Sequence, residues 1–159
     1  MNRIMITEDY VSFEIAKLLK EKGFNEPCTY LWIFEKTNNL DVDANGIYKC
    51  PLKRYMESDY CNNTSIELLK KEDEYWNDNT DIFTCPTLQM AIKWLREVHN
   101  LSVEVYRTAC GYIGCIVAIP SGTDIKFLED DGDDLPSGQY TTFEKACEAT
   151  VQYCLKNLI

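Results

Sequence analysis

Three segments of the chain open with the same local pattern: a hydroxyl residue, an apolar residue, Glu or Gln, any residue, and Ala. These segments start at Ser12, Thr87 and Thr142. A Ser or Thr at such a position accepts a hydrogen bond from the first free amides of a helix, and Thr141 with Glu144 adds a capping box to the third segment. Because apolar side chains then recur at helical spacing, the sequence predicts three main helices, over about residues 8–22, 87–99 and 142–157.

The ends and faces of these helices follow from the same spacing. The first helix is expected to end at Gly23, with Phe24 folding back onto its apolar side. In the second and third helices we expect one buried stripe each, with Trp94 at the edge of the second. The stripes consist of Leu88, Ala91, Ile92, Leu95 and Val98 in the second helix and of Phe143, Cys147, Val151, Cys154 and Leu158 in the third.

Short apolar or alternating runs between the helices predict β-strands. These strands lie at residues 30–34, 112–119 and 125–128, and around Val103 and Val105. The dipeptide at residues 45–46, Asn-Gly, is typical of a hairpin that would return the chain through residues 47–50. Residues 67–76 are a candidate fourth helix, although their apolar spacing is irregular and residues 77–81 are turn-like.

Helices and antiparallel hairpins in separate blocks are typical of an α+β fold. A chain of 159 residues is long enough to bury one core. We therefore expect a single α+β domain over residues 1–159, with an antiparallel sheet of about four to five strands packed by the three main helices.

The chain is acidic, because 16 Lys and Arg stand against 26 Asp and Glu, a formal net charge of −10 at pH 7. Like charges repel, so no direct contact with nucleic acid or an anionic membrane is expected, whereas a basic protein partner stays open. The first residues lack the apolar region of a secretory signal, and no later apolar run is long enough to span a membrane. We therefore expect a cytoplasmic protein.

Eight cysteines could form disulfides, bind a metal, or serve as small buried hydrophobic residues. The expected cytoplasmic location disfavours disulfides. Zinc sites need closely paired ligands, but Cys110 and Cys115 are separated by four residues and His99 is the only histidine. Cys147 and Cys154 instead share one face of a predicted helix, as core positions do. We expect buried, reduced thiols, no metal and no other cofactor.

A segment before the expected hairpin turn partly matches a calcium-binding loop. Asp41, Asp43, Asn45 and Gly46 fit its first half, in which side-chain oxygens at alternate positions surround the ion. The twelfth position, which should be Glu, is Leu52. Because Asp and Asn before Gly are also common in turns, a turn without calcium is favoured.

Two clusters are candidates for a protein-interaction surface. The first is acidic and consists of Glu129, Asp130, Asp131, Asp133 and Asp134; the alternative is a solvated loop of mutually repelling charges. The second is aromatic and includes Tyr75 and Trp76, which could anchor an interface because aromatic side chains offer a large contact area. The alternative for these aromatic residues is packing of the hairpin against the helices.

Residues 6–24, 85–98 and 143–159, which carry the three helix signals in this order, together resemble an uncharacterised family of small proteins from gut Bacteroidetes and their phages or prophages. The resemblance implies an intracellular protein with an origin in such a bacterium or on a mobile element such as a phage or prophage. It implies no activity and supplies no catalytic residues, since the matching positions lie mostly on the expected core faces.

These observations favour a small, acidic, non-catalytic protein-interaction module with an unknown protein partner. The alternative is a small enzyme or ligand-binding protein with a pocket between sheet and helices. An enzyme of this kind would use a cysteine or carboxylates with His99, but a histidine in the last turn of a helix is already explained by the negative helix end. A homo-oligomer stays open as well.

Overall fold

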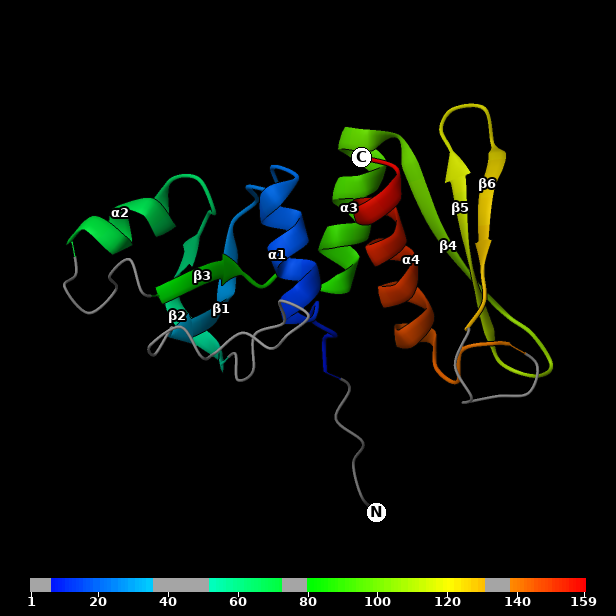
Figure 1. The fold of residues 1–159 in the computed structure, drawn as a ribbon, viewed down its shortest axis with the longest axis horizontal. Coiled ribbons are helices and arrows are strands. Elements are labelled where there is room, and N and C mark those ends of the chain that lie inside the picture. Colours follow the sequence, from blue (N-terminus) through cyan, green and yellow to red (C-terminus); the bar gives the residue numbers. More distant parts are fainter. Residues whose placement is uncertain (1–6, 36–51, 73–79, 131–137) are drawn as a thin grey trace, which may run out of the picture. The chain divides into compact units, whose positions relative to one another are not determined.

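The computed structural model describes residues 7–35, 52–72, 80–130 and 138–159. These residues form four helices and six strands, and the strands make two three-stranded antiparallel sheets, ordered β2-β1-β3 and β4-β5-β6 (Figure 1). The predicted α+β class is confirmed. The expectation of one sheet with four to five strands is wrong, because within the described residues the two groups of strands share no hydrogen-bonded neighbour.

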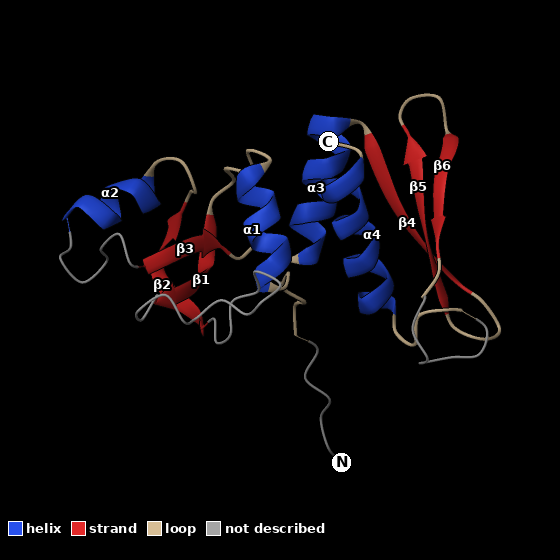
Figure 2. Cartoon of the chain, viewed as in Figure 1, coloured by secondary structure: helices blue, strands red, loops and turns tan. Residues whose placement is uncertain are grey.

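The chain divides into two compact units, each with its own sheet and helices (Figure 2). Ser12–Pro86 form one, called the middle unit below, and Met1–Val11 with Thr87–Ile159 form the other, called the terminal unit. The expectation of a single domain over residues 1–159 stays a prediction. Each unit is described by itself.

The middle unit contains α1 (Phe13–Glu21), β1 (Cys28–Glu35), β2 (Leu52–Tyr60), α2 (Ser65–Glu72) and β3 (Thr80–Thr84). α1 begins after Ser12, whose hydroxyl accepts a hydrogen bond from the Ile15 amide, so the helix starts at residue 13 and not at residue 8. It ends before Gly23, whose φ of 90° suits glycine. The Phe24 amide then donates to the Leu19 carbonyl at 2.9 Å, as expected for this type of helix end.

Two helices pack on opposite faces of the sheet β2-β1-β3, because side chains alternate along each strand. On one face, the ring of Phe13 in α1 meets those of Trp32 and Phe83 edge-on, with centroid distances of 6.1 Å and 5.3 Å. On the other face, a core cluster joins α2 to the strands. This cluster consists of Leu31, Ile33, Ile66 and Ile82, with Met56, Tyr60 and Leu69 packed against it.

β1 confirms the strand predicted at residues 30–34, but the sequence does not predict its partners. β2 pairs with it on one side, with Tyr30 opposite Tyr55, and β3 pairs on the other, with Trp32 opposite Phe83. The expected turn and return strand at residues 45–50 lie outside the described residues. β3 begins at Thr80, inside the segment expected to be a turn, because Ile82 and Phe83, which follow, are buried in the core.

A buried asparagine connects three parts of the middle unit. Asn62, just before α2, is fully buried. Its side-chain amide donates to the Phe24 carbonyl at 2.9 Å and to the Thr84 hydroxyl at 2.8 Å, while its carbonyl accepts from the Thr84 amide at 3.1 Å. Asn62 therefore connects the start of α2 to the end of β3 and to the segment that follows α1.

The terminal unit contains α3 (Leu88–His99), β4 (Leu101–Arg107), β5 (Tyr112–Ala118), β6 (Thr123–Leu128) and α4 (Phe143–Asn157). All five elements confirm predicted helices or strands. The hydroxyls of Thr87 and Thr142 cap the helices by accepting from backbone amides three residues further on, each at 3.1 Å. The N-terminal segment belongs to this unit, since the Leu88 amide donates to the Asp9 carbonyl at 2.8 Å.

α4 packs across one face of the sheet β4-β5-β6 at a glycine. A Cβ atom added to Gly114 in β5 would lie 2.0 Å from Oγ1 of Thr150 and 3.4 Å from the carbonyl oxygen of Ala146. Thr150 is fully buried in α4, and its hydroxyl donates to that same carbonyl at 2.7 Å. The missing side chain at Gly114 is therefore what allows the helix to approach the strand.

The predicted buried stripes are largely confirmed, with three exceptions in α3 and α4. Trp94, expected at the edge, is buried, whereas Val98 is 56% exposed and Phe143 is 40% exposed. Val98 and Phe143 lie in the terminal turns of their helices. Their spacing continues the apolar stripe, but these turns extend beyond the buried core.

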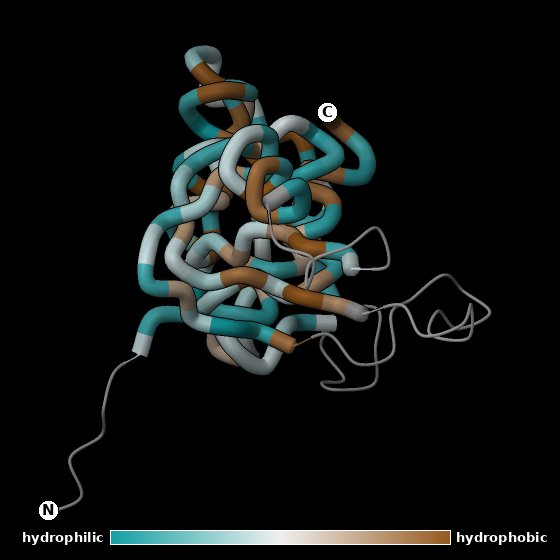
Figure 3. The backbone as a smooth tube through the Cα atoms, turned by 90° about the vertical axis from the view of Figure 1, so that its left-hand side faces the viewer, coloured by the Kyte–Doolittle hydropathy of each residue, from teal (hydrophilic) through white to brown (hydrophobic). Residues whose placement is uncertain are grey.

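Apolar stretches along the backbone are short and interrupted by polar residues (Figure 3). Accordingly, in the part of the chain that the structure describes, no helix has both the length and the apolar character needed to cross a membrane.

Gly114→Ala should lower the free energy of unfolding by about 1–3 kcal/mol, because the added methyl group collides with Thr150. Urea denaturation of Gly114→Ala, Thr150→Ala and the double variant measures this. The double variant should cost less than the sum of the single variants, since Thr150→Ala removes the colliding oxygen. Additive losses would show that the collision is not the cause.

Asn62→Ala should lower the free energy of unfolding by roughly 1–3 kcal/mol, because it removes the buried hydrogen bonds that Asn62 makes with Phe24 and Thr84. Asn63→Ala is the matched control, since the Asn63 side chain is exposed next to it. Equal urea midpoints for the two variants would contradict the role assigned to Asn62.

Candidate functional site

Among the described residues of the terminal unit, no helix lies on one face of the sheet β4-β5-β6. α3 and α4 both lie on the other face (Figure 1). Gly114 faces α4, so its neighbours in β5 point away from the helix. The strand register extends this open face to all three strands, because Cys115 lies opposite both Glu104 and Phe127. The open face consists of Ser102, Glu104, Tyr106, Ile113, Cys115, Val117, Asp124 and Phe127.

The open face combines exposed aromatic rings with carboxylates. Tyr106 is 50% exposed and Phe127 is 53% exposed. Glu104 and Asp124 supply two negative charges, and none of the eight open-face positions is a Lys or Arg. The pKa of Tyr106 is raised by desolvation and by the nearby Cys115 and the two carboxylates, which agrees with their shared face.

At the centre of the open face, larger side chains cover a thiol. Cys115 is fully buried, and its Sγ donates to Oδ1 of Asp124 at 3.7 Å. Burial, followed by the charge and hydrogen bond of Asp124, raises the pKa of this thiol. Cys115 therefore stays protonated at neutral pH and orients the Asp124 carboxylate.

Only the beginning of the predicted acidic cluster lies within the described residues. Glu129 and Asp130 directly follow β6; the Glu129 carbonyl accepts from the Tyr140 hydroxyl at 3.1 Å, and the Asp130 amide donates to the Gly138 carbonyl at 2.7 Å. The remaining predicted interaction residues, Asp131, Asp133, Asp134, Tyr75 and Trp76, lie outside the described residues, as does the calcium-like segment at residues 41–46.

His99 does not have the surroundings that a cysteine hydrolase requires. Its ring meets Trp94 edge-on at 4.5 Å, and its Nε2 is buried without a hydrogen-bond partner among the described residues. Burial lowers the pKa of His99, which is the direction opposite to the one that a negative helix end would favour. No cysteine or carboxylate in the described part of the chain is bound to Nε2.

The expectation of buried thiols is confirmed for most of the described cysteines. Cys28, Cys85, Cys115, Cys147 and Cys154 are buried, and no described cysteine is in a disulfide. Burial raises the pKa of Cys28, Cys85 and Cys154 to about 12 each. Such thiols are protonated at neutral pH and are poor nucleophiles.

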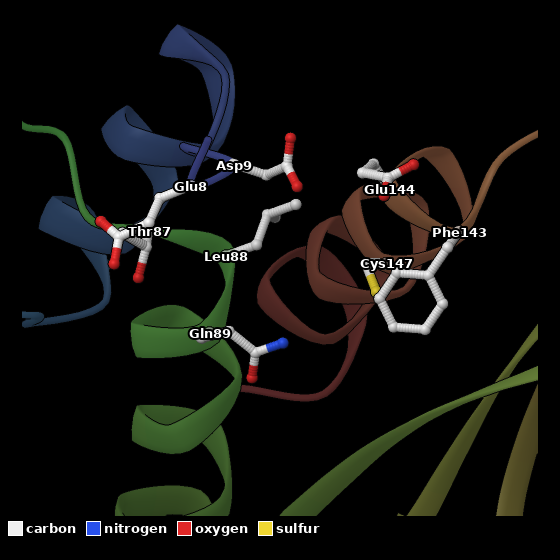
Figure 4. A pocket seen from close by; sticks show the side chains of 8 residues that line it. All are labelled: Glu8, Asp9, Thr87, Leu88, Gln89, Phe143, Glu144 and Cys147. Atoms are coloured by element: carbon white, nitrogen blue, oxygen red, sulfur yellow. The ribbon is translucent and has the colours of Figure 1, made fainter. Parts of the chain in front are cut away.

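A pocket lies at the N-terminal ends of α3 and α4, with a volume of about 170 Å³ (Figure 4). It is lined by Glu8, Asp9, Thr87, Leu88, Gln89, Phe143, Glu144 and Cys147. These residues come from three segments that are far apart in the sequence, so sequence reasoning misses the pocket. The only signal is the presence of acidic residues near two helix starts.

Among the described residues, no group of three or more His, Cys, Asp or Glu side chains could hold a metal ion. The expectations about cofactors stay predictions. Comparisons with protein-family models, curated proteins and solved structures find no match to this chain. The candidate sites therefore depend on geometry and chemistry alone.

His99→Phe should make stability less sensitive to acid. Because burial lowers the pKa of His99 from its ordinary value of 6.5, the unfolded chain binds a proton more readily than the folded one. The stability contributed by neutral His99 is therefore complete above 6.5 and is lost as pH falls through that value towards the folded-state pKa. Phe keeps a ring against Trp94 but cannot titrate.

Urea denaturation at about pH 7.5 and about pH 5.5 tests this expectation. Wild type should lose more unfolding free energy between the two pH values than His99→Phe does. An identical loss in both proteins would show that His99 does not titrate differently on folding.

Proposed function

We propose that the protein is a non-catalytic interaction module that binds a basic protein segment on the open face. The observation that carries this proposal is a helix-free sheet face on which two half-exposed aromatic rings lie among carboxylates. Interfaces use aromatic residues as anchors because they bury a large area at a small entropic cost. Tyr106 and Phe127 would be those anchors.

Charge supports the choice of a basic partner. Glu104 and Asp124 bring negative charge to the open face without a nearby cation at the other open-face positions, and the chain as a whole carries a net charge of −10. Nucleic acid would be repelled by this field. Two copies of the same acidic face would repel each other as well, which disfavours a homodimer through it.

The acidic cluster at residues 129–134 would add to this surface, because Glu129 and Asp130 follow β6 directly. It would increase the rate of encounter with a basic partner through long-range attraction. A cytoplasmic location, and the expected relation to small proteins of gut Bacteroidetes and their phages, are part of the same proposal.

A short peptide that alternates Lys with Val is a suitable probe of the open face. In an NMR titration of the isotope-labelled protein, amide signals of β4, β5 and β6 should shift. Glu104→Gln/Asp124→Asn should weaken binding about tenfold, since each exposed ion pair contributes up to about 1 kcal/mol. Asn at position 124 can still accept from the Cys115 thiol, so the fold should be kept.

Glu14→Gln/Glu21→Gln is the matched control, because it removes the same charge from exposed positions of α1 in the middle unit. It should leave the affinity nearly unchanged, and a peptide with Glu in place of Lys should not bind. An equal loss of affinity in the control, or shifts confined to the helices, would overturn the proposal.

A further inference from the structure

The pocket between the N-terminal ends of α3 and α4 has an acidic lining that helix capping does not use. Capping is done by other groups: the Thr87 and Thr142 hydroxyls accept from the Met90 and Lys145 amides, and the Leu88 amide donates to the main-chain carbonyl of Asp9. Among the described residues, the carboxylates of Asp9 and Glu144 make no hydrogen bond or ion pair. Both carboxylates are therefore available to a ligand.

The charges around the pocket favour a cation. Glu8, Asp9 and Glu144 bring three carboxyl groups to the pocket, and none of the described residues that line it is a Lys or Arg. Each of the two helix N-termini contributes only about half a positive charge, so the carboxylates dominate. The Glu8 carboxylate accepts from the Tyr10 hydroxyl at 3.3 Å, which leaves the other two as the main contacts for a ligand.

The floor of the pocket is apolar and contains an unpartnered thiol. Leu88 is buried, and the ring of Phe143 stands at the rim, edge-on to Tyr112 at 6.2 Å. Cys147 is only 1% exposed and lines the pocket, and its thiol has no hydrogen-bond partner among the described residues. Figure 4 shows its sulfur on the side of α4 that carries the pocket.

We propose that this pocket binds a small organic cation, with an ammonium group between the carboxylates of Asp9 and Glu144 and a short hydrocarbon part against Leu88, Phe143 and Cys147. A volume of about 170 Å³ is close to that of cavities known to hold a benzene-sized molecule. A metal ion fits less well, because the acidic side chains do not converge as metal ligands in the described part of the chain.

n-Butylammonium chloride is the probe for this site, and sodium butyrate is the matching anion of similar shape. In an NMR titration, butylammonium should shift the methyl signals of Leu88 and the signals of Cys147, and butyrate should not. Asp9→Asn and Glu144→Gln should each weaken the binding of butylammonium about threefold or more, by removing one exposed ion pair.

Glu97→Gln is the matched control, since it removes one exposed carboxylate from the far end of α3, in the same unit but outside the pocket lining. It should leave the affinity for butylammonium unchanged. The proposal is overturned if the control weakens binding as much as Glu144→Gln does, if butyrate binds equally well, or if the Leu88 methyl signals do not move.

Discussion

The approach of α4 to β5 at Gly114 is the contact on which the terminal unit depends. Because no side chain stands at this position, Thr150 fits directly above the strand, and the buried side of α4 closes the core on one face of the sheet. Within the described residues of the terminal unit, the opposite face of the sheet has no helix packed on it. The contact at Gly114 also fixes where the first turn of α4 lies, and with it the position of Glu144 and Cys147 in the pocket.

The middle unit has a polar counterpart of this contact. Asn62 uses both ends of its side-chain amide, so the arrangement of α2, β3 and the segment after α1 depends on directional hydrogen bonds as well as on packing. Buried polar groups of this kind are satisfied in only one geometry. The apolar cluster around Ile66 could tolerate small shifts, whereas the hydrogen bonds of Asn62 could not.

The helices could be predicted from the sequence because their signals are local: a capping hydroxyl, a stripe and a terminal glycine. Strands such as β4 and β5 were equally accessible through their apolar patterns. Strand partners were not, since pairing β1 with both β2 and β3 depends on contacts between distant residues. For the same reason, composition points to an acidic surface, but only the strand register places Glu104 and Asp124 together, and only folding assembles the pocket from Asp9 and Glu144.

The pairing of Tyr10 with Thr87, together with the hydrogen bond between Asp9 and Leu88, gives the chain the topology of an insertion. The chain enters the middle unit after Val11 and re-enters the terminal unit at Thr87, next to the paired residue Tyr10. Joining these two points through a folded unit costs less closure entropy than joining them through a flexible loop of the same length. During synthesis, every residue of the middle unit emerges from the ribosome before Thr87 does. The order of translation thus allows the middle unit to fold before the strands and helices of the terminal unit are complete.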